Sequence, residues 1–316
     1  MTDKQAEVAA RVVVLRRIFA HHPAFLQLEE QFRLLLDRRR AELAAGLITE
    51  ARGIAVVGAS GSGKTTAIAR LLSHTPGLVS ENQKDSRRDV VSFQVPSPAT
   101  LKFVGQTALE ALGYPLRRNR TEMIIWEMVR HHLQQRKTLF LHLDEAQDLL
   151  RYQTPKMLQS VVRTLKSLMQ TKEWPVGLIL SGMPEVKDLL NHDPQLARRF
   201  YPVEFPRLRA GLDGERVIEI VASYADRTSM ETGNTVGDDF AARLIRAADG
   251  EFGLVIELII GAIEEALIAG DRRLDRQHFT CAFRRRSGCI DGLNPFLADD
   301  FERINVRELL QVETVR

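Results

Sequence analysis

Residues 58–65 read Gly-Ala-Ser-Gly-Ser-Gly-Lys-Thr, which is a glycine, four variable positions and then Gly-Lys-Thr. An apolar run, residues 54–57, precedes this stretch, and a helical pattern, residues 66–72, follows it. Between a strand and a helix, such a loop turns successive backbone N–H groups toward phosphates, and the helix start adds partial positive charge. The stretch therefore predicts a nucleotide-binding loop in a fold built on a parallel sheet.

The loop also assigns individual roles. Lys64 is expected to reach the β- and γ-phosphates of ATP, and the Thr65 hydroxyl is expected to bind Mg²⁺. The expected nucleotide contacts in the loop are Gly58, Ala59, Ser60, Gly61, Ser62, Gly63, Lys64, Thr65 and Thr66.

A second group of candidate residues follows the apolar run at residues 138–143. Asp144 and Glu145 end this run, and in a P-loop ATPase such a pair holds Mg²⁺ through the aspartate and polarises the attacking water through the glutamate. We expect Asp144 to belong to the nucleotide and metal site and Glu145 to act as the base. A glutamate at this place favours hydrolytic ATPases over small-molecule kinases and GTPases. His142, inside the run, is expected to pack in the sheet.

Strand-like and helix-like patterns alternate through the middle of the chain, which predicts a three-layer α/β/α fold with a parallel five-stranded sheet. The expected strands are residues 54–58, 90–95, 138–143, 176–181 and 203–205, and the helices between them are 100–112, 122–135 and 155–170. Residues 5–45 read as helix interrupted near Pro23. After about residue 206 only helices are expected, at 214–228, 236–248 and 253–269.

These patterns divide the chain into four expected parts. They are an N-terminal helical segment (1–50), a P-loop ATPase core (51–208), a small all-α lid (209–290) and a C-terminal arm (291–316). The arm includes a helix-like stretch at residues 301–310. It is suited equally to docking a partner protein and to packing on the lid.

Composition excludes several classes of protein. The 316 residues are 44% hydrophobic and 27% charged, and no apolar run approaches the roughly 20 residues of a membrane span. The N-terminus lacks the apolar core of a secretory signal. Cys281 and Cys289 are too few for a disulfide scaffold or a zinc module, which favours the reducing cytoplasm. A net charge of +3 is too small to indicate a nucleic-acid partner by itself.

Ser181 and the pair Arg198 and Arg199 are further candidates for the nucleotide site. Ser181 ends the strand expected at 176–181, beside the acidic pair, where its hydroxyl is suited to sensing the γ-phosphate or to forming a turn. Arg198 and Arg199 end a helical stretch just before the last strand. Arginines there interact favourably with the helix dipole, and they also stand where one subunit could reach its neighbour's nucleotide.

With these motifs the chain resembles the AAA+ ATPases and, more narrowly, the TniB/TnsC family of bacterial transposition regulators. It is also similar to MuB. The resemblance covers about residues 22–292. It rests on the P-loop, the Val-Pro-Ser turn at 95–97 with Thr100 and Lys102, LEALGYP at 109–115, LDEAQDL at 143–149, Leu-Lys at 165–166, SGMPE at 181–185 and QLARRF at 195–200.

The resemblance implies an ATPase that oligomerises on duplex DNA as a hexameric ring or a helical filament, selects target sites, and recruits or activates a DDE transposase. A TniQ-like targeting protein is a further implied partner. Lys64 and Thr65 become the Walker A contacts, Asp144 and Glu145 the Walker B pair, Ser181 the first sensor, and Arg198 or Arg199 the finger acting in trans. Gly253 stands where many AAA+ proteins have an arginine, so we expect no cis-acting second sensor and slow hydrolysis stimulated by assembly.

The resemblance also implies a DNA-facing surface after the second strand and around the next helix. These residues would meet phosphates and carry little sequence information. The candidates are Thr100, Lys102, Arg117, Arg118, Arg120 and Thr121. Two other readings remain: a loader or ExeA-like AAA+ protein that acts on a protein complex without encircling DNA, and a STAND-type nucleotide switch.

Overall fold

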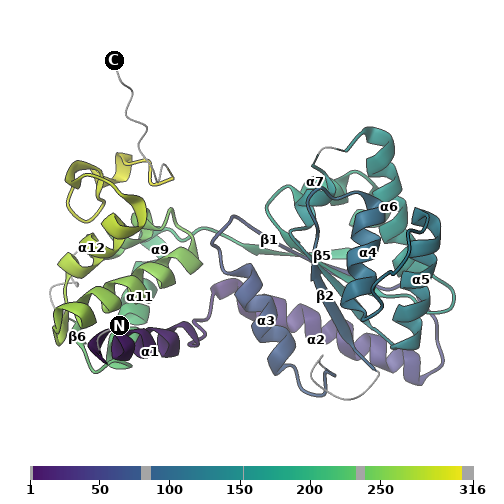
Figure 1. Cartoon of the computed structure of the whole chain (residues 1–316), viewed down its shortest axis with the longest axis horizontal. Coiled ribbons are helices and arrows are strands. Elements are labelled where there is room, and N and C mark those ends of the chain that lie inside the picture. The colour runs from purple at the N-terminus through teal and green to yellow at the C-terminus, as the bar shows by residue number, and fades with distance from the viewer. Residues whose placement is uncertain (1–2, 80–86, 152, 233–238, 308–316) are drawn as a thin grey trace. The chain divides into compact units, whose positions relative to one another are not determined.

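The computed structural model describes residues 3–79, 87–151, 153–232 and 239–307 (Figure 1). The chain forms two compact units. The sheet unit consists of His22–Ser60 and Lys64–Phe205, and the helical unit consists of Met1–His21, Gly61–Gly63 and Pro206–Arg316. The N-terminal segment expected as one part is divided between them, because α1 (Asp3–Arg16) belongs to the helical unit and α2 (Pro23–Ala44) to the sheet unit.

The sheet unit contains one sheet of five parallel strands in the order β2-β3-β4-β1-β5, which confirms the predicted fold class. In chain order the strands are β1 (Gly53–Gly58), β2 (Val90–Gln94), β3 (Phe140–Asp144), β4 (Gly177–Gly182) and β5 (Phe200–Phe205). Each lies within a few residues of its expected position, since nearly continuous apolar runs are typical of strands buried on both faces.

Helices cover both faces of this sheet (Figure 1). On one face, Leu143 and Leu180 share a buried cluster with residues of five α-helices. These helices are α4 (Leu101–Ala111), α5 (Glu122–Gln135), α6 (Pro155–Gln170), α7 (Val186–Asn191) and α8 (Pro194–Ala197). The opposite face carries α2 and α3 (Lys64–His74), and there the Phe32 ring of α2 lies 5.3 Å from the Phe140 ring of β3. Because side chains alternate along a strand, His142 and Asp144 lie on the same face as Phe140.

The helical unit is built from five helices among the described residues, and α12 among them was not expected from the sequence. They are α1, α9 (Ala210–Asp226), α10 (Phe240–Ala247), α11 (Phe252–Ala269) and α12 (Arg276–Ser287). Residues 236–238 of the helix expected at 236–248 lie outside the described residues. Two short strands, β6 (Glu231–Thr232) and β7 (Arg273–Leu274), pair in parallel within this unit.

Residues 291–307 pack against the helical unit of their own chain. Phe296 is buried, with its ring 5.7 Å from that of Phe279, and Arg243 donates hydrogen bonds to the carbonyl oxygens of Pro295 and Ala298. The helix expected at 301–310 is only a 3-10 turn at Phe301–Arg303, and residues 308–310 lie outside the described part. No helix in the described residues is long and apolar enough to cross a membrane.

Candidate nucleotide-binding site

The glycine-rich loop connects β1, which ends at Gly58, to α3, which begins at Lys64. Gly61 and Gly63 have φ angles of +82° and +93°, a left-handed conformation that side chains disfavour, so the pattern needs glycine at both positions. The Lys64 ammonium donates to the carbonyl oxygens of Gly58 at 2.7 Å and Ala59 at 2.8 Å. The loop thus curls around its own lysine at the N-terminus of a helix, the arrangement suited to binding an anion.

Thr65 and Asp144, expected to share a metal ion, are brought together by α3 and β3. The Thr65 Oγ1 lies 3.3 Å from Asp144 Oδ2, and Asp144 Oδ1 accepts hydrogen bonds from Ser181 and from the Glu145 N–H. Mg²⁺ is usually held by one or two protein oxygens together with phosphate oxygens and water. The pair fits such an ion, whereas the described residues contain no group of three metal-ligating side chains that could hold one alone.

Glu145 follows β3 in a left-handed conformation, with φ 55° and ψ 39°. Its Oε2 accepts a hydrogen bond of 2.5 Å from the Gln147 amide, and the Gln147 Oε1 accepts one from the Met183 N–H at 3.0 Å. Gln147 is almost entirely buried, and a Cβ at Gly182 would lie only 2.1 Å from its Oε1. Gln147 therefore links the expected base to the segment after β4, a role that the sequence signalled only through its place in the DEAQ motif.

The sequence predicted Ser181 as the last residue of its strand. Ser181 lies inside β4, is completely buried, and donates a 2.6 Å hydrogen bond to Asp144 Oδ1. Its hydroxyl also contacts His142 Nε2 at 2.7 Å, and His142 Nδ1 contacts Ser92 at 2.5 Å. The serine hydroxyl thus holds the aspartate carboxylate in place. His142 is buried as expected, but both its ring nitrogens are hydrogen-bonded.

The environment of His142 determines its protonation state. Burial lowers its pKa to about 4, although the negative charge of Asp144 acts in the opposite direction. The ring is therefore neutral at pH 7, with one nitrogen as donor and the other as acceptor.

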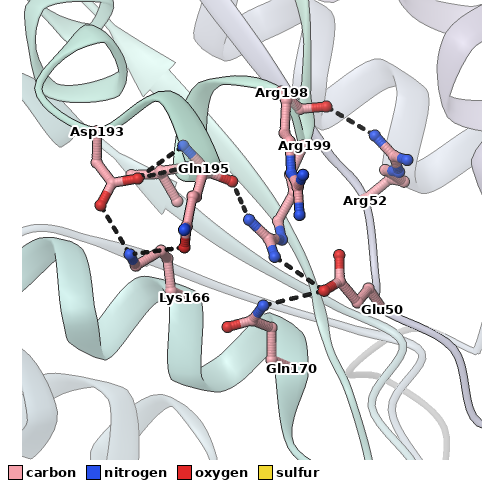
Figure 2. A network of polar contacts seen from close by, with 9 residues as sticks. Glu50, Arg52, Lys166, Gln170, Asp193, Gln195, Arg198 and Arg199 are labelled. Atoms are coloured by element: carbon pink, nitrogen blue, oxygen red, sulfur yellow. Dashed lines mark hydrogen bonds and ion pairs between the residues drawn. The ribbon is translucent and has the colours of Figure 1, made fainter.

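The two candidate finger arginines have different environments, as Figure 2 shows. Arg199 is completely buried, and its guanidinium donates to the Gln195 carbonyl oxygen and to Glu50 Oε1. Arg198 is exposed; its carbonyl oxygen accepts a hydrogen bond from Arg52, and no described residue bonds its guanidinium. The Arg199 guanidinium is thus hydrogen-bonded within its own chain, which favours Arg198 as the candidate finger.

The candidate DNA residues belong to the ends of α4 and α5 and the loop between them. Thr100 and Thr121 are the N-caps of these helices, accepting hydrogen bonds from the Phe103 and Ile124 N–H groups. Lys102 lies in the first turn of α4 and is half-buried. Arg117, Arg118 and Arg120 are exposed and line a hollow of about 380 Å³ together with Tyr114, Pro115, Leu116, Met128 and His132. Among the described residues, none bonds the side chains of these three arginines.

A three-layer fold with this loop, this acid pair and this strand order defines a P-loop ATPase of the AAA+ class. Residues 19–210 match the family described as Bacterial TniB protein. The chain therefore belongs to the TniB family.

Solved structures show the same fold at low sequence identity. The Cdc6p protein of Pyrobaculum aerophilum is similar with a TM-score of 0.58 and 16% identity, over 84% of this chain and 68% of that one. The Aeropyrum pernix ORC1 protein, solved in complex with DNA, gives 0.57 and 15%, over 85% and 66%. The A. pernix ORC2 protein gives 0.57 and 17%, over 82% and 67%. No match was found among curated protein sequences.

Proposed function

We propose that this chain is an ATP-dependent regulator of DNA transposition that assembles on duplex DNA. The observation that carries the proposal is the convergence of Lys64, Thr65, Asp144 and Glu145 at the carboxyl edge of the sheet, in a chain of the TniB family. In parallel α/β sheets ligands bind at this edge.

The site residues have distinct parts in hydrolysis. The Lys64 ammonium donates hydrogen bonds to the Gly58 and Ala59 carbonyl oxygens. When ATP binds, the ammonium donates to the β- and γ-phosphate oxygens instead. Thr65 and Asp144 would hold Mg²⁺, which would supply neutralisation of charge on the phosphates. Glu145 Oε2 is anchored by Gln147, so its other oxygen is available to orient a water and accept its proton.

A neighbouring subunit completes the site with Arg198. Its guanidinium is exposed beside the buried Arg199, so in an oligomer it can reach across an interface to the γ-phosphate. A finger supplied in this way contributes about 10³–10⁵ in rate in well-studied NTPases. Hydrolysis is therefore proposed to be slow in the monomer and stimulated by assembly into a ring or filament.

The DNA surface is proposed to be the α4–α5 loop with the first turn of α4. Arg117, Arg118 and Arg120 present three charges on one exposed loop, with no ion-pair partner among the residues that the structure describes, which suits phosphates of a duplex backbone. Lys102 adds a fourth charge, and Thr100 and Thr121 begin helices whose N-termini favour phosphate. A DDE transposase and a TniQ-like protein are the proposed protein partners, on the basis of the family.

Salt titration tests this DNA surface. Each lost phosphate contact lowers the slope of log affinity against log salt by about 0.9. We expect Lys102→Ala combined with Arg118→Ala to reduce the slope for duplex DNA by about 2 in the presence of ATP. Arg163→Ala removes an exposed arginine from α6 and serves as the matched control, with an unchanged slope. An unchanged slope in the double variant removes this loop from the interface.

A further inference from the structure

Four polar side chains form a hydrogen-bonded chain across three strands on the face of the sheet that bears α2 and α3. Ser92 of β2 lies directly opposite His142 of β3 in the strand register, and their Oγ and Nδ1 atoms are 2.5 Å apart. His142 Nε2 is 2.7 Å from the Ser181 hydroxyl of β4, which is 2.6 Å from Asp144 Oδ1. The chain starts at an exposed serine on the edge strand and ends at the expected metal ligand.

Counting protons fixes the direction of every bond in this chain. A carboxylate oxygen only accepts, so the single proton of the Ser181 hydroxyl is donated to Asp144 Oδ1, which lies 2.6 Å away. The Ser181 oxygen must therefore accept, which makes His142 Nε2 the protonated nitrogen. In a neutral imidazole the remaining nitrogen, Nδ1, then accepts the proton of Ser92.

This direction determines which oxygen of Asp144 is presented to a metal ion. Oδ1 accepts from both the Ser181 hydroxyl and the Glu145 N–H, at 2.6 and 3.1 Å. Oδ2 faces Thr65 Oγ1 instead, at 3.3 Å. One oxygen is thus anchored to the protein, and the other is directed to the place where Mg²⁺ is proposed to bind.

We propose that His142 is a positioning residue for the magnesium ligand: its Nε2–H holds the Ser181 hydroxyl so that Ser181 orients the Asp144 carboxylate. The inference rests on the proposed Mg²⁺–ATP site. Without a donor at position 142, Ser181 is free to turn its proton toward its other acceptor, the Leu143 carbonyl oxygen at 3.5 Å, and the hold on Asp144 weakens. Outer-shell partners of metal ligands commonly change metal affinity about 10–100-fold.

Nucleotide affinity measured with Mg²⁺ and again with EDTA tests the proposal. In His142→Leu we expect the Mg²⁺-dependent gain in ATP affinity to fall about tenfold, with the EDTA affinity within about twofold of the wild type. His142→Gln keeps an N–H donor near the Nε2 position and should retain the gain. Ile179→Val, a change at the residue opposite His142 on β4, alters packing without altering a hydrogen bond, and is the matched control.

A second variant tests whether the two residues act in series. Ser181→Ala should lose the same gain as His142→Leu, and the double variant should lose no more than Ser181→Ala alone. Additive losses would mean that His142 acts by another route, and they would overturn the proposal. So would a His142→Leu variant that keeps the full gain.

The metal-free protein gives an independent readout if His142→Leu fails to fold. The ¹⁵N shifts of the His142 ring in the wild type should identify a proton on Nε2, whereas a ring with no proton on Nε2 would overturn the proposal. A wild type that binds no nucleotide refutes the proposed function. A wild type with a clear Mg²⁺-dependent gain, together with a His142 ring that has no proton on Nε2, refutes only the role of His142.

Discussion

Removing Glu50 should destabilise the sheet unit more than removing Glu50 and Arg199 together. The Arg199 guanidinium is completely buried, and its hydrogen bonds go to the Gln195 carbonyl oxygen and to Glu50 (Figure 2). Glu50→Ala leaves this charge in the interior without its carboxylate. Arg199→Met in the same chain removes the charge and fills much of its volume with an apolar side chain.

The expected loss follows from the burial of the two partners. Breaking a fully buried ion pair costs about 3–5 kcal/mol, and a hydrogen bond to a charged group is worth about 1.5–3 kcal/mol. The Glu50 side chain is 46% exposed, so water replaces part of the interaction and the lower range applies. We expect Glu50→Ala to cost about 2 kcal/mol, or about 4–8 °C in Tm. The double variant should lie within about 1 kcal/mol of the wild type.

Urea denaturation at several pH values measures both effects. The pKa of Glu50 is lowered from its ordinary 4.5, first by the hydrogen bond from Gln170 and then by Arg199. A carboxylate with a lowered pKa contributes stability above its unfolded pKa and loses it as the pH falls through the folded value. The difference between wild type and Glu50→Ala should therefore be full at pH 7 and shrink below about pH 4.5. A double variant less stable than Glu50→Ala would refute this explanation.

Three further outcomes are expected at the nucleotide site. Glu145→Gln should still bind ATP but hydrolyse it about 10²–10⁴-fold more slowly, measured by phosphate release. Arg198→Ala should lower the DNA-stimulated rate of ATP hydrolysis by about 10³-fold without changing ATP affinity or Tm. Mixing the Arg198→Ala protein with the Glu145→Gln protein should restore activity, because one subunit then supplies the base and the other the finger. No recovery would contradict a site shared between subunits. Gln147→Ala should reduce kcat about tenfold through the loss of one hydrogen bond to Glu145, with an unchanged Kd for ATP; a changed Kd alone would contradict this.

The sequence predicted the sheet unit well because its signals are local. Apolar runs bounded by loops located all five strands, and Thr121 and Pro155 mark helix starts that the structure retains at Glu122–Gln135 and Pro155–Gln170. The helical unit was predicted less well. Helix α12 is rich in arginine, so its apolar face, which includes Phe279 and Phe283, was too narrow to recognise.

The site shows the same division between local and distant information. The loop and the acid pair are defined by contiguous residues, and the structure brings Thr65 next to Asp144 as expected. Burial and partner choice depend on strands far apart in sequence, so nothing local distinguished Arg198 from Arg199. The sequence alone could not predict the hydrogen bonds that join Ser92 to Ser181 through His142. The three residues belong to three strands, and only the strand register shows that they lie side by side.

ATP is proposed to join copies of this chain on a double helix. Electron microscopy of the wild type with duplex DNA, comparing a non-hydrolysable ATP analogue with ADP, would show whether it does. We expect rings or filaments enclosing DNA with the analogue, with Arg198 of each subunit directed at its neighbour's nucleotide. Single subunits without DNA in the presence of saturating analogue would contradict it.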